Sequence, residues 1–83
     1  MTYKIIWDKK AKENLKKLDL FVAKRILKKI NELQENPFSK DLKRLKGEIV
    51  FRLRVGDYRA LVEIENNNIK VLKIGHRKNI YEY

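Results

Sequence analysis

The stretch EIVFRLRVGDYRALVEI, residues Glu48 to Ile64, decides the fold because it has the pattern of a β-hairpin. Apolar residues take every second position from Ile49 to Val55, which is typical of a strand with one buried face. The dipeptide Gly56-Asp57 then interrupts the pattern, and a second apolar run follows it. Glycine tolerates the positive φ that a type I′ or II′ turn requires, so the dipeptide predicts a two-residue hairpin loop.

A loop of that length brings arginines from both strands onto one face of the sheet. It pairs Val55 with Tyr58 and Arg54 with Arg59, and Arg52 lies two residues along the same face. Clustered guanidinium groups repel one another unless an anion neutralises them. Two interpretations stay open: a solvated face whose long side chains cover apolar surface, or an anion site, since guanidinium donates in a planar fork to phosphate.

Two amphipathic helices are predicted before the hairpin. A first strand covers residues 2–7, and Asp8 is a candidate N-cap for a helix through Leu18. Asp19 caps a second helix that continues to about Asn36, where Pro37 stops it. Its buried stripe is predicted to be Ala23, Ile26, Leu27, Ile30 and Leu33.

The remaining segments complete one small domain, residues 1–83. Residues 38–47 are predicted to be a basic connector with one helical turn around Leu42 and Leu45. Asn66 to Asn68 indicates a turn, and residues 69–75 form a last strand with apolar residues on both faces, so its register stays open. The order β-α-α-β-β-β predicts an α+β fold, with a helical hairpin packed on one face of a mainly antiparallel sheet.

Composition limits the partners and the chemistry. The chain carries 21 Lys and Arg against 11 Asp and Glu, a net charge of +10, which favours nucleic acid or an acidic protein as partner. It has no cysteine and one histidine, so we expect no metal and no cofactor. No apolar run is long enough to span a bilayer, and we expect a soluble, cytoplasmic protein.

Two strings of the sequence resemble a known family. RLKGEIVFRLRVGDYRALVEI followed by IKVLKIGHRKNIY is similar to the RelE/ParE superfamily of bacterial and archaeal toxins, most clearly in LRVGDYR and GHRKNIY. The resemblance covers the whole chain in element order and implies a RelE-like, microbial-RNase-like fold. In the RelE branch it implies an mRNA interferase, a ribosome-dependent endoribonuclease that inhibits translation by cutting mRNA in the A site. That reaction is metal-free: the ribose 2′-hydroxyl attacks the neighbouring phosphate.

The resemblance also implies roles for single residues. Arg52, Arg59 and Arg77 take catalytic positions, together with a C-terminal tyrosine. Tyr83 has the spacing from Arg77 found in the best-studied branch, and Tyr81 is the alternative. Either ring is suited to stack on a splayed substrate base.

Two further residues are predicted to contact the substrate. Arg54 adds charge to the phosphate site, and His76 is a candidate for proton transfer because its unperturbed pKa lies near neutrality. Where the best-studied branch has a lysine, this chain has Val50. Since arginine is a poor general base, the sequence leaves the base unassigned.

The family resemblance implies an acidic, RelB-like antitoxin, bound in a heterodimer or heterotetramer, alongside the ribosome and mRNA. Two alternatives remain: a ParE-like DNA gyrase inhibitor with the same fold, and a noncatalytic basic nucleic-acid-binding module. Ribosome-dependent RNA cleavage separates the first interpretation from both alternatives.

Overall fold

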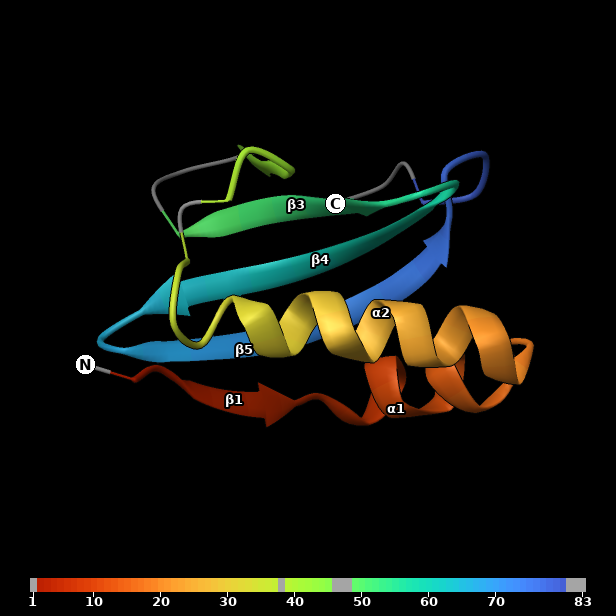
Figure 1. The fold of residues 1–83 in the computed structure, drawn as a ribbon, viewed down its shortest axis with the longest axis horizontal. Helices are drawn as coiled ribbons and strands as arrows, with labels where there is room; N and C mark the ends of the chain where they lie inside the picture. Colours follow the sequence, from red (N-terminus) through yellow and green to blue (C-terminus); the bar gives the residue numbers. More distant parts are fainter. Residues whose placement is uncertain (1, 38, 46–48, 81–83) are drawn as a thin grey trace.

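The computed structural model describes residues 2–37, 39–45 and 49–80, in which two helices lie against one face of a five-stranded sheet (Figure 1). The elements in chain order are β1 (Lys4–Trp7), α1 (Lys9–Lys16), α2 (Leu20–Glu32), β2 (Leu42–Arg44), β3 (Val50–Val55), β4 (Tyr58–Glu65) and β5 (Asn68–His76). The strand order is β1-β5-β4-β3-β2. Only β1 with β5 is parallel among the described strand pairs, so the predicted α+β fold is confirmed.

Both helices begin where the sequence predicted. The carboxylate of Asp8 accepts a hydrogen bond from the backbone N–H of Lys10, and that of Asp19 accepts one from Phe21, at 3.3 and 2.8 Å. Each cap satisfies a backbone donor that has no partner inside its helix. The second helix ends at Glu32, a few residues before the predicted end at Asn36, and turns follow it.

The connector after α2 is a strand and not a helical turn, so that expectation was wrong. Residues Leu42 to Arg44 pair antiparallel with Leu53 to Phe51. Beyond the strand, the N–H of Leu45 donates to the carbonyl of Val50 at 2.8 Å. The spacing of Leu42 and Leu45 suits a helix, but β3 offers the unpaired hydrogen-bonding groups of a sheet edge. Pairing with that edge decides the local structure.

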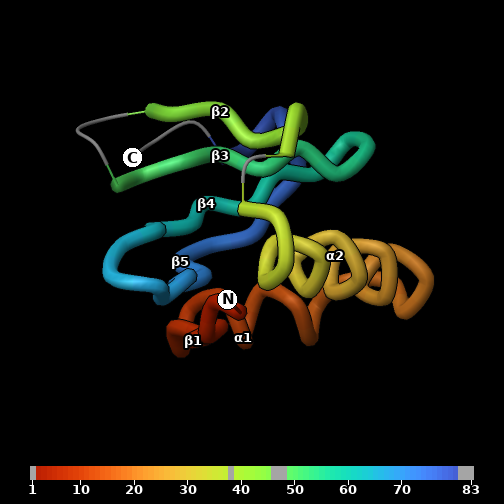
Figure 2. The backbone as a smooth tube through the Cα atoms, turned by 60° about the vertical axis from the view of Figure 1, so that its left-hand side comes forward, coloured from red at the N-terminus to blue at the C-terminus, as the bar shows by residue number. Residues whose placement is uncertain are grey.

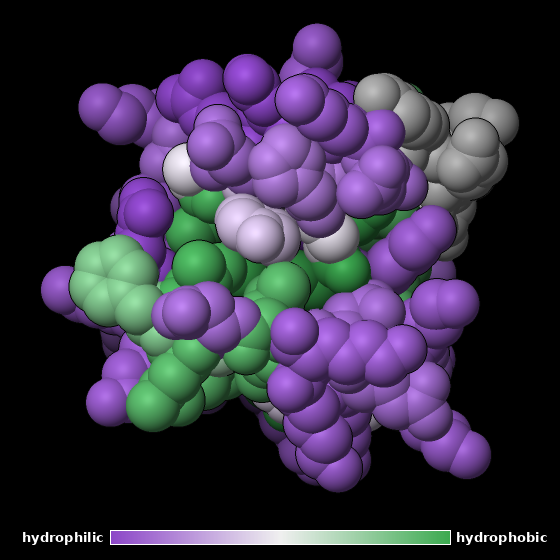
Figure 3. Space-filling view, turned by 90° about the vertical axis from the view of Figure 1, so that its right-hand side faces the viewer, coloured by the Kyte–Doolittle hydropathy of each residue, from purple (hydrophilic) through white to green (hydrophobic). Residues whose placement is uncertain are grey.

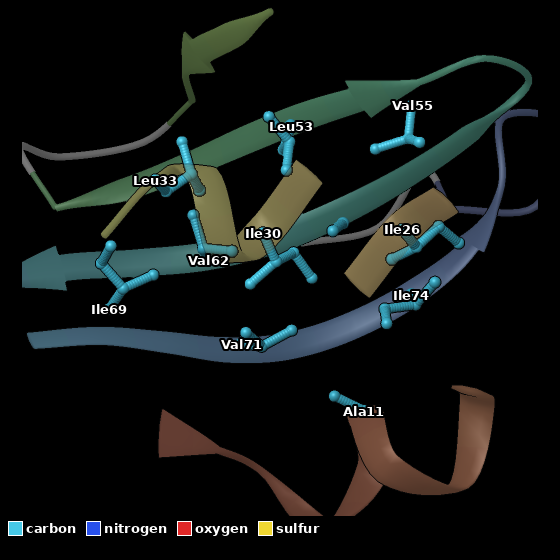
Figure 4. Close-up of a cluster of buried hydrophobic side chains, with 11 residues drawn as sticks. Ala11, Ile26, Ile30, Leu33, Leu53, Val55, Val62, Ile69, Val71 and Ile74 are labelled. Atoms are coloured by element: carbon cyan, nitrogen blue, oxygen red, sulfur yellow. The ribbon is translucent and has the colours of Figure 1, made fainter. Parts of the chain in front are cut away.

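The core fills the space between α2 and the sheet (Figure 4). From α2 it takes Ile26 and Ile30, and from the C-cap of α2 it takes Leu33. All three are almost fully buried, as predicted, whereas Leu27 is only half-buried. The facing residues of the sheet are Leu53, Val55, Ala60, Val62, Ile69, Val71 and Ile74. Figure 2 shows from a second angle that α1 and α2 lie on the same side of the sheet, which leaves the opposite face uncovered by either described helix.

A β-bulge explains the two apolar faces of β5. Leu61 pairs with Lys73, but the next residue, Val62, pairs with Val71. The extra residue, Leu72, reverses the alternation of the strand. Val71 and Ile74 therefore both point into the core although they are three positions apart, which is why the sequence alone did not fix the register.

The hairpin has the predicted register. Val55 pairs with Tyr58 and Arg54 with Arg59. Gly56 has φ of +59°, and Asp57 is not among the residues with positive φ, which is the pattern of a type II′ turn.

Candidate functional site: an arginine-lined cleft on the open face of the sheet

The predicted arginines share the face of the sheet that the two helices leave uncovered. Arg54 and Arg59 form one cross-strand pair, and Arg52 pairs with Leu61 in the next row. β2 extends that row, because Lys43 pairs with Arg52, and β5 extends it on the other side, because Lys73 pairs with Leu61. Paired residues point to the same side of a sheet. We call the surface formed by Arg52, Arg54 and Arg59 the arginine face.

Arg59 is held in place by the hairpin turn. Its Nη1 donates hydrogen bonds to the carbonyl oxygens of Gly56 and Tyr58, both at 2.9 Å. Burial lowers the pKa of Arg59, and the charges of Arg52, Arg54 and Arg77 lower it further. A lowered pKa means that the charged guanidinium is disfavoured where it stands. An anion bound beside it would offset this penalty, so the surroundings of Arg59 favour an anion as ligand.

Arg77 reaches the same place from the segment after β5. Its backbone N–H donates to the carbonyl of Asp57 at 2.8 Å, and its Nε lies 3.8 Å from the Asp57 carboxylate. The hairpin turn therefore positions both Arg59 and Arg77. These two arginines line one cleft of about 410 Å³ together with Arg52, Lys78 and Ile80. Its lining includes no carboxylate among the residues that the structure describes. We call it the catalytic cleft after the role that the sequence predicts for its three arginines.

Ile80 fixes the chain beyond Arg77 on the open face. Its side chain is 5% exposed, although neither α1 nor α2 covers this side of the sheet. A Cβ placed on Gly75 would lie 3.5 Å from the Cβ of Ile80, in ordinary van der Waals contact. Gly75 pairs with Arg59 across the sheet. The contact between Ile80 and Gly75 thus places the end of the described chain next to Arg59.

Arg54 is engaged by a carboxylate. Its Nη2 lies 3.1 Å from Oδ1 of Asp41, and the Nζ of Lys29, on α2, lies 2.8 Å from Oδ2. The hydrogen bond from Lys29, followed by that from Arg54, lowers the pKa of Asp41. Arg54 lines a second cleft of about 230 Å³ with Arg52, Arg59, Lys40, Asp41 and Lys43. We call it the connector cleft, because Lys40 to Lys43 lie between α2 and β3.

His76 lies on the other side of the sheet from the arginine face. It pairs with Tyr58, whose ring packs against the core on the helix side of the sheet. The two rings meet edge to face with centroids 5.3 Å apart. The Nδ1 of His76 accepts a hydrogen bond from the backbone N–H of Lys78 at 3.1 Å. This arrangement gives His76 a structural role at the end of β5, and its contact with substrate stays a prediction.

Comparison with known proteins places the chain in a family. A family model described as "ParE toxin of type II toxin-antitoxin system, parDE" matches residues 5–81. The chain belongs to the RelE/ParE toxin family. "Toxin RelE3" of Methanocaldococcus jannaschii is 34% identical over 85 residues, which span 96% of this chain and 97% of that protein. The family resemblance seen in the sequence is therefore confirmed.

Solved structures of antitoxin–toxin complexes contain similar chains. A chain of the archaeal RelE–RelB complex from Pyrococcus horikoshii has a TM-score of 0.85 at 28% identity, covering 95% of this chain and 99% of that one. A chain of the RelB–RelE antitoxin–toxin complex from Methanococcus jannaschii has a TM-score of 0.77 at 32% identity, covering 92% and 94%. The protein is a type II toxin–antitoxin toxin of the RelE family.

The toxin's site contains lysines that the sequence did not single out. Lys78 lines the catalytic cleft, and its position directly after Arg77 was an available signal. Lys43 lies beside the arginine face because β2 pairs it with Arg52. Lys73 lies on the same face because the bulge in β5 sets its pairing with Leu61. Both depend on long-range pairing, so no local pattern could have indicated them. The two predicted tyrosines, Tyr81 and Tyr83, lie outside the described residues, and their roles stay predictions.

Neither a metal-binding cluster nor a membrane-spanning helix occurs in the described part of the chain. Within residues 2–37, 39–45 and 49–80, no group of three or more His, Cys, Asp or Glu side chains is placed to hold a metal ion. Over the same residues, no helix is both long and apolar enough to cross a membrane.

The toxin also exposes an apolar pair at the start of α2. Leu20 and Phe21 are 69% and 68% exposed. Figure 3 views the end of the molecule where α1 connects to α2 and shows hydrophobic surface framed by hydrophilic residues. Single exposed apolar residues are common, but two large neighbours beside apolar surface indicate a contact site. Lys17 and Lys24 flank the pair along the chain.

Proposed function

We propose that this RelE-family toxin is a ribosome-dependent endoribonuclease that cleaves mRNA in the A site. The observation that supports this most strongly is the catalytic cleft, in which Arg52, Arg59 and Arg77 meet with no carboxylate among the described lining residues. A cleft whose described lining holds cations and no carboxylate suits a reaction whose transition state carries more negative charge than its ground state.

The proposed reaction is an internal transesterification. The ribose 2′-oxygen loses its proton and attacks the adjacent phosphorus, and the bond from phosphorus to the 5′-oxygen breaks. The products are a 2′,3′-cyclic phosphate and a 5′-hydroxyl, so the leaving oxygen must gain a proton. On the path from the intact RNA to these products, a phosphorane with two negative charges forms. Its stabilisation requires positive charge at a fixed position.

Arg59 is the residue best placed to stabilise the phosphorane. Two carbonyl oxygens fix its Nη1, so its position is set before substrate arrives, as transition-state stabilisation requires. Arg52 lines the cleft from the neighbouring strand and Arg77 from the far side. Arg77 is exposed and more loosely held, at 3.8 Å from Asp57. It is therefore suited to stabilise charge on the leaving oxygen.

The described lining of the cleft does not supply an efficient general base. It consists of arginines, Lys78 and Ile80, and an arginine remains protonated at any physiological pH. The proposed toxin is therefore a slow nuclease on free RNA. Its rate depends on a substrate that the ribosome holds in the attacking geometry, since orientation alone contributes several powers of ten.

The same surface suits an acidic antitoxin. The net charge of +10 and the exposed Arg54 and Arg77 favour an anionic protein partner. The similar chains from Pyrococcus horikoshii and Methanococcus jannaschii come from structures of RelE–RelB complexes. We therefore expect a RelB-like antitoxin in a heterodimer or heterotetramer with this toxin.

A second candidate is inhibition of DNA gyrase, because the matching family model is described as a ParE toxin. The two are separated by one pair of assays on the purified toxin. Cleavage of mRNA on programmed ribosomes, with far slower cleavage of the same RNA in free solution, is the result expected of the proposed function. Inhibition of gyrase supercoiling without any cleavage would replace it with the ParE function.

A further inference from the structure

A third basic cleft lies between α2 and the hairpin turn. It has a volume of about 480 Å³. Its lining residues are Arg25, Lys28, Lys29, Glu32, Asp41, Arg54, Val55 and Gly56. Four of these side chains are cationic and two are carboxylates. We call it the helix cleft, because α2 supplies half of its lining.

The helix cleft and the connector cleft share a wall. Asp41 and Arg54 line both of them, and these two side chains are joined by an ion pair. The connector cleft in turn shares Arg52 and Arg59 with the catalytic cleft. The three clefts therefore form a continuous series around β3, from the open face of the sheet to the side of α2.

Two cations of the helix cleft are available to bind a ligand. Asp41 is matched by Lys29 and Arg54, whereas Arg25 and Lys28 form no ion pair with any residue in the ranges 2–37, 39–45 and 49–80. Both side chains are exposed on α2. Because they are unmatched by these residues, an anion entering this cleft gains attraction without first breaking an ion pair.

The guanidinium of Arg25 can approach the hairpin turn because Gly56 has no side chain. A Cβ on Gly56 would lie 3.1 Å from Nη2 and 3.3 Å from Nη1 of Arg25, closer than nine in ten real Cβ contacts. The guanidinium therefore lies directly against the backbone of the turn whose carbonyls hold Arg59. One turn thus connects a cation of the helix cleft with the central cation of the catalytic cleft.

From this series we infer that the helix cleft is a second phosphate-binding site, which holds the RNA backbone a few nucleotides away from the bond that is cut. The inference rests on the proposed function, because RNA is its ligand. An RNA strand can follow the shared walls from one cleft to the next, and each phosphate meets guanidinium or ammonium groups that suit it. An acidic protein would also meet these cations, but the continuity with the catalytic cleft favours the strand bound there.

The test measures RNA binding as a function of strand length. The probes are 2′-O-methyl RNAs, which lack the attacking hydroxyl, as a dinucleotide and as a strand of about ten nucleotides. The test variant is R25Q/K28Q. The control is K4Q/K70Q, which removes the same charge from exposed residues of neighbouring strands at the other end of the sheet. Thermal melting confirms that both variants fold.

The expected result is selective for variant and length. R25Q/K28Q should weaken binding of the long strand roughly threefold to tenfold, and the slope of its salt dependence should fall by about 0.7 for each phosphate that the variant no longer neutralises. Binding of the dinucleotide to R25Q/K28Q should change far less. Binding of both probes to K4Q/K70Q should also change far less. Equal weakening in both variants, or unchanged long-strand binding in R25Q/K28Q, would overturn the inference. Weakening confined to antitoxin binding would assign the cleft to an acidic protein instead.

The reaction itself is measured separately. If the toxin shows this binding pattern but does not cut mRNA on ribosomes, the proposed reaction fails and the helix cleft stands. If the toxin cuts mRNA on ribosomes but R25Q/K28Q binds the long strand as tightly as the unchanged toxin, the proposed reaction stands and the helix cleft fails as a phosphate-binding site.

Discussion

Asp41 and Arg54 are joined through both their backbones and their side chains. The N–H of Arg54 donates to the carbonyl of Asp41 at 2.9 Å, and Nη2 of Arg54 donates to Oδ1 of Asp41 at 3.1 Å. Because Lys29 holds the other carboxylate oxygen, one aspartate ties together α2, the residues before β2, and β3.

This tie predicts how stability depends on pH. The hydrogen bonds from Lys29 and Arg54 place the folded-state pKa of Asp41 below the ordinary value of an aspartate. Its contribution is therefore fully present above the ordinary pKa of an aspartate, about 3.9, and is lost as the pH falls through the lower folded-state pKa. Melting curves between neutral and acidic pH should show that Asp41→Asn is less stable than the unchanged toxin near neutrality. The difference should shrink as the carboxylate is protonated, and a constant difference would contradict this role for the charge.

Replacing Arg59 should remove the activity and leave the fold intact. Arg59→Ala deletes the fixed donor of the catalytic cleft, and losing one such donor slows catalysis about 100- to 1,000-fold. Its two hydrogen bonds are to turn carbonyls, and its charge is repelled by its neighbours. We therefore expect a change in unfolding free energy of about 1 kcal/mol or less. Growth arrest on induction and circular dichroism are the measurements.

Two controls belong with Arg59→Ala. Arg59→Lys keeps the charge but loses the planar fork, and should recover only part of the rate. Lys70→Ala removes an exposed cation of β5 near the other end of the sheet and should leave growth arrest unchanged. A folded Arg59→Ala toxin that still arrests growth fully would remove Arg59 from the mechanism.

The hairpin register, the helix caps and most of the core could be predicted because each depends on nearby residues. Gly56 sets the turn, Asp8 and Asp19 cap their own helices, and Ile26 and Ile30 follow helical spacing. These features require no knowledge of distant partners.

Apart from Lys78, whose position directly after Arg77 was a local signal, the missed features come from contacts between distant segments. Leu42 and Lys43 form a strand only because β3 has a free edge, and the faces of β5 depend on a bulge against β4. The positions of Lys43 and Lys73 follow from these two events. The pairing of His76 with Tyr58 is likewise a long-range contact, and the predicted contact of His76 with substrate stays a prediction.

Arg77→Ala should reduce cleavage less than Arg59→Ala does. Arg77 lines the same cleft, but its side chain is half-exposed and 3.8 Å from its partner Asp57, so its position is less constrained. Exposed charges act through water and contribute less than fixed ones. We expect a reduction of about tenfold to 100-fold, mainly in the rate of the chemical step, measured in single-turnover cleavage on ribosomes. Equal effects of the two substitutions would show that both arginines contact the reacting phosphate.

Affinity for the ribosome should fall steeply with salt. Each phosphate neutralised by Lys or Arg releases counterions, so the logarithm of the binding constant falls linearly with the logarithm of salt concentration. The net charge of +10 and three basic clefts predict several such contacts. Binding measured from low to physiological salt should weaken by at least about tenfold. A flat dependence would argue against docking through the basic surface.

Leu20 and Phe21 form the exposed apolar pair at the start of α2. We expect the antitoxin to cover them, because an acidic segment with apolar residues matches both the pair and the lysines that flank it. In L20S/F21S the antitoxin should bind about tenfold to 100-fold more weakly, since each large apolar side chain buried contributes about 1.5–3 kcal/mol at most. Growth arrest by the toxin alone should be unchanged, because neither residue lines any of the three clefts.

Melting curves provide the second measurement of this prediction. A partner that binds only the folded toxin raises its melting temperature by mass action, so the antitoxin should stabilise the unchanged toxin more than it stabilises L20S/F21S at equal concentrations. The matched control is K9S/K10S, which alters two exposed residues at the start of α1 and keeps the apolar pair. If L20S/F21S binds the antitoxin as tightly as the control does, the antitoxin lies elsewhere on the toxin and the apolar pair has another partner.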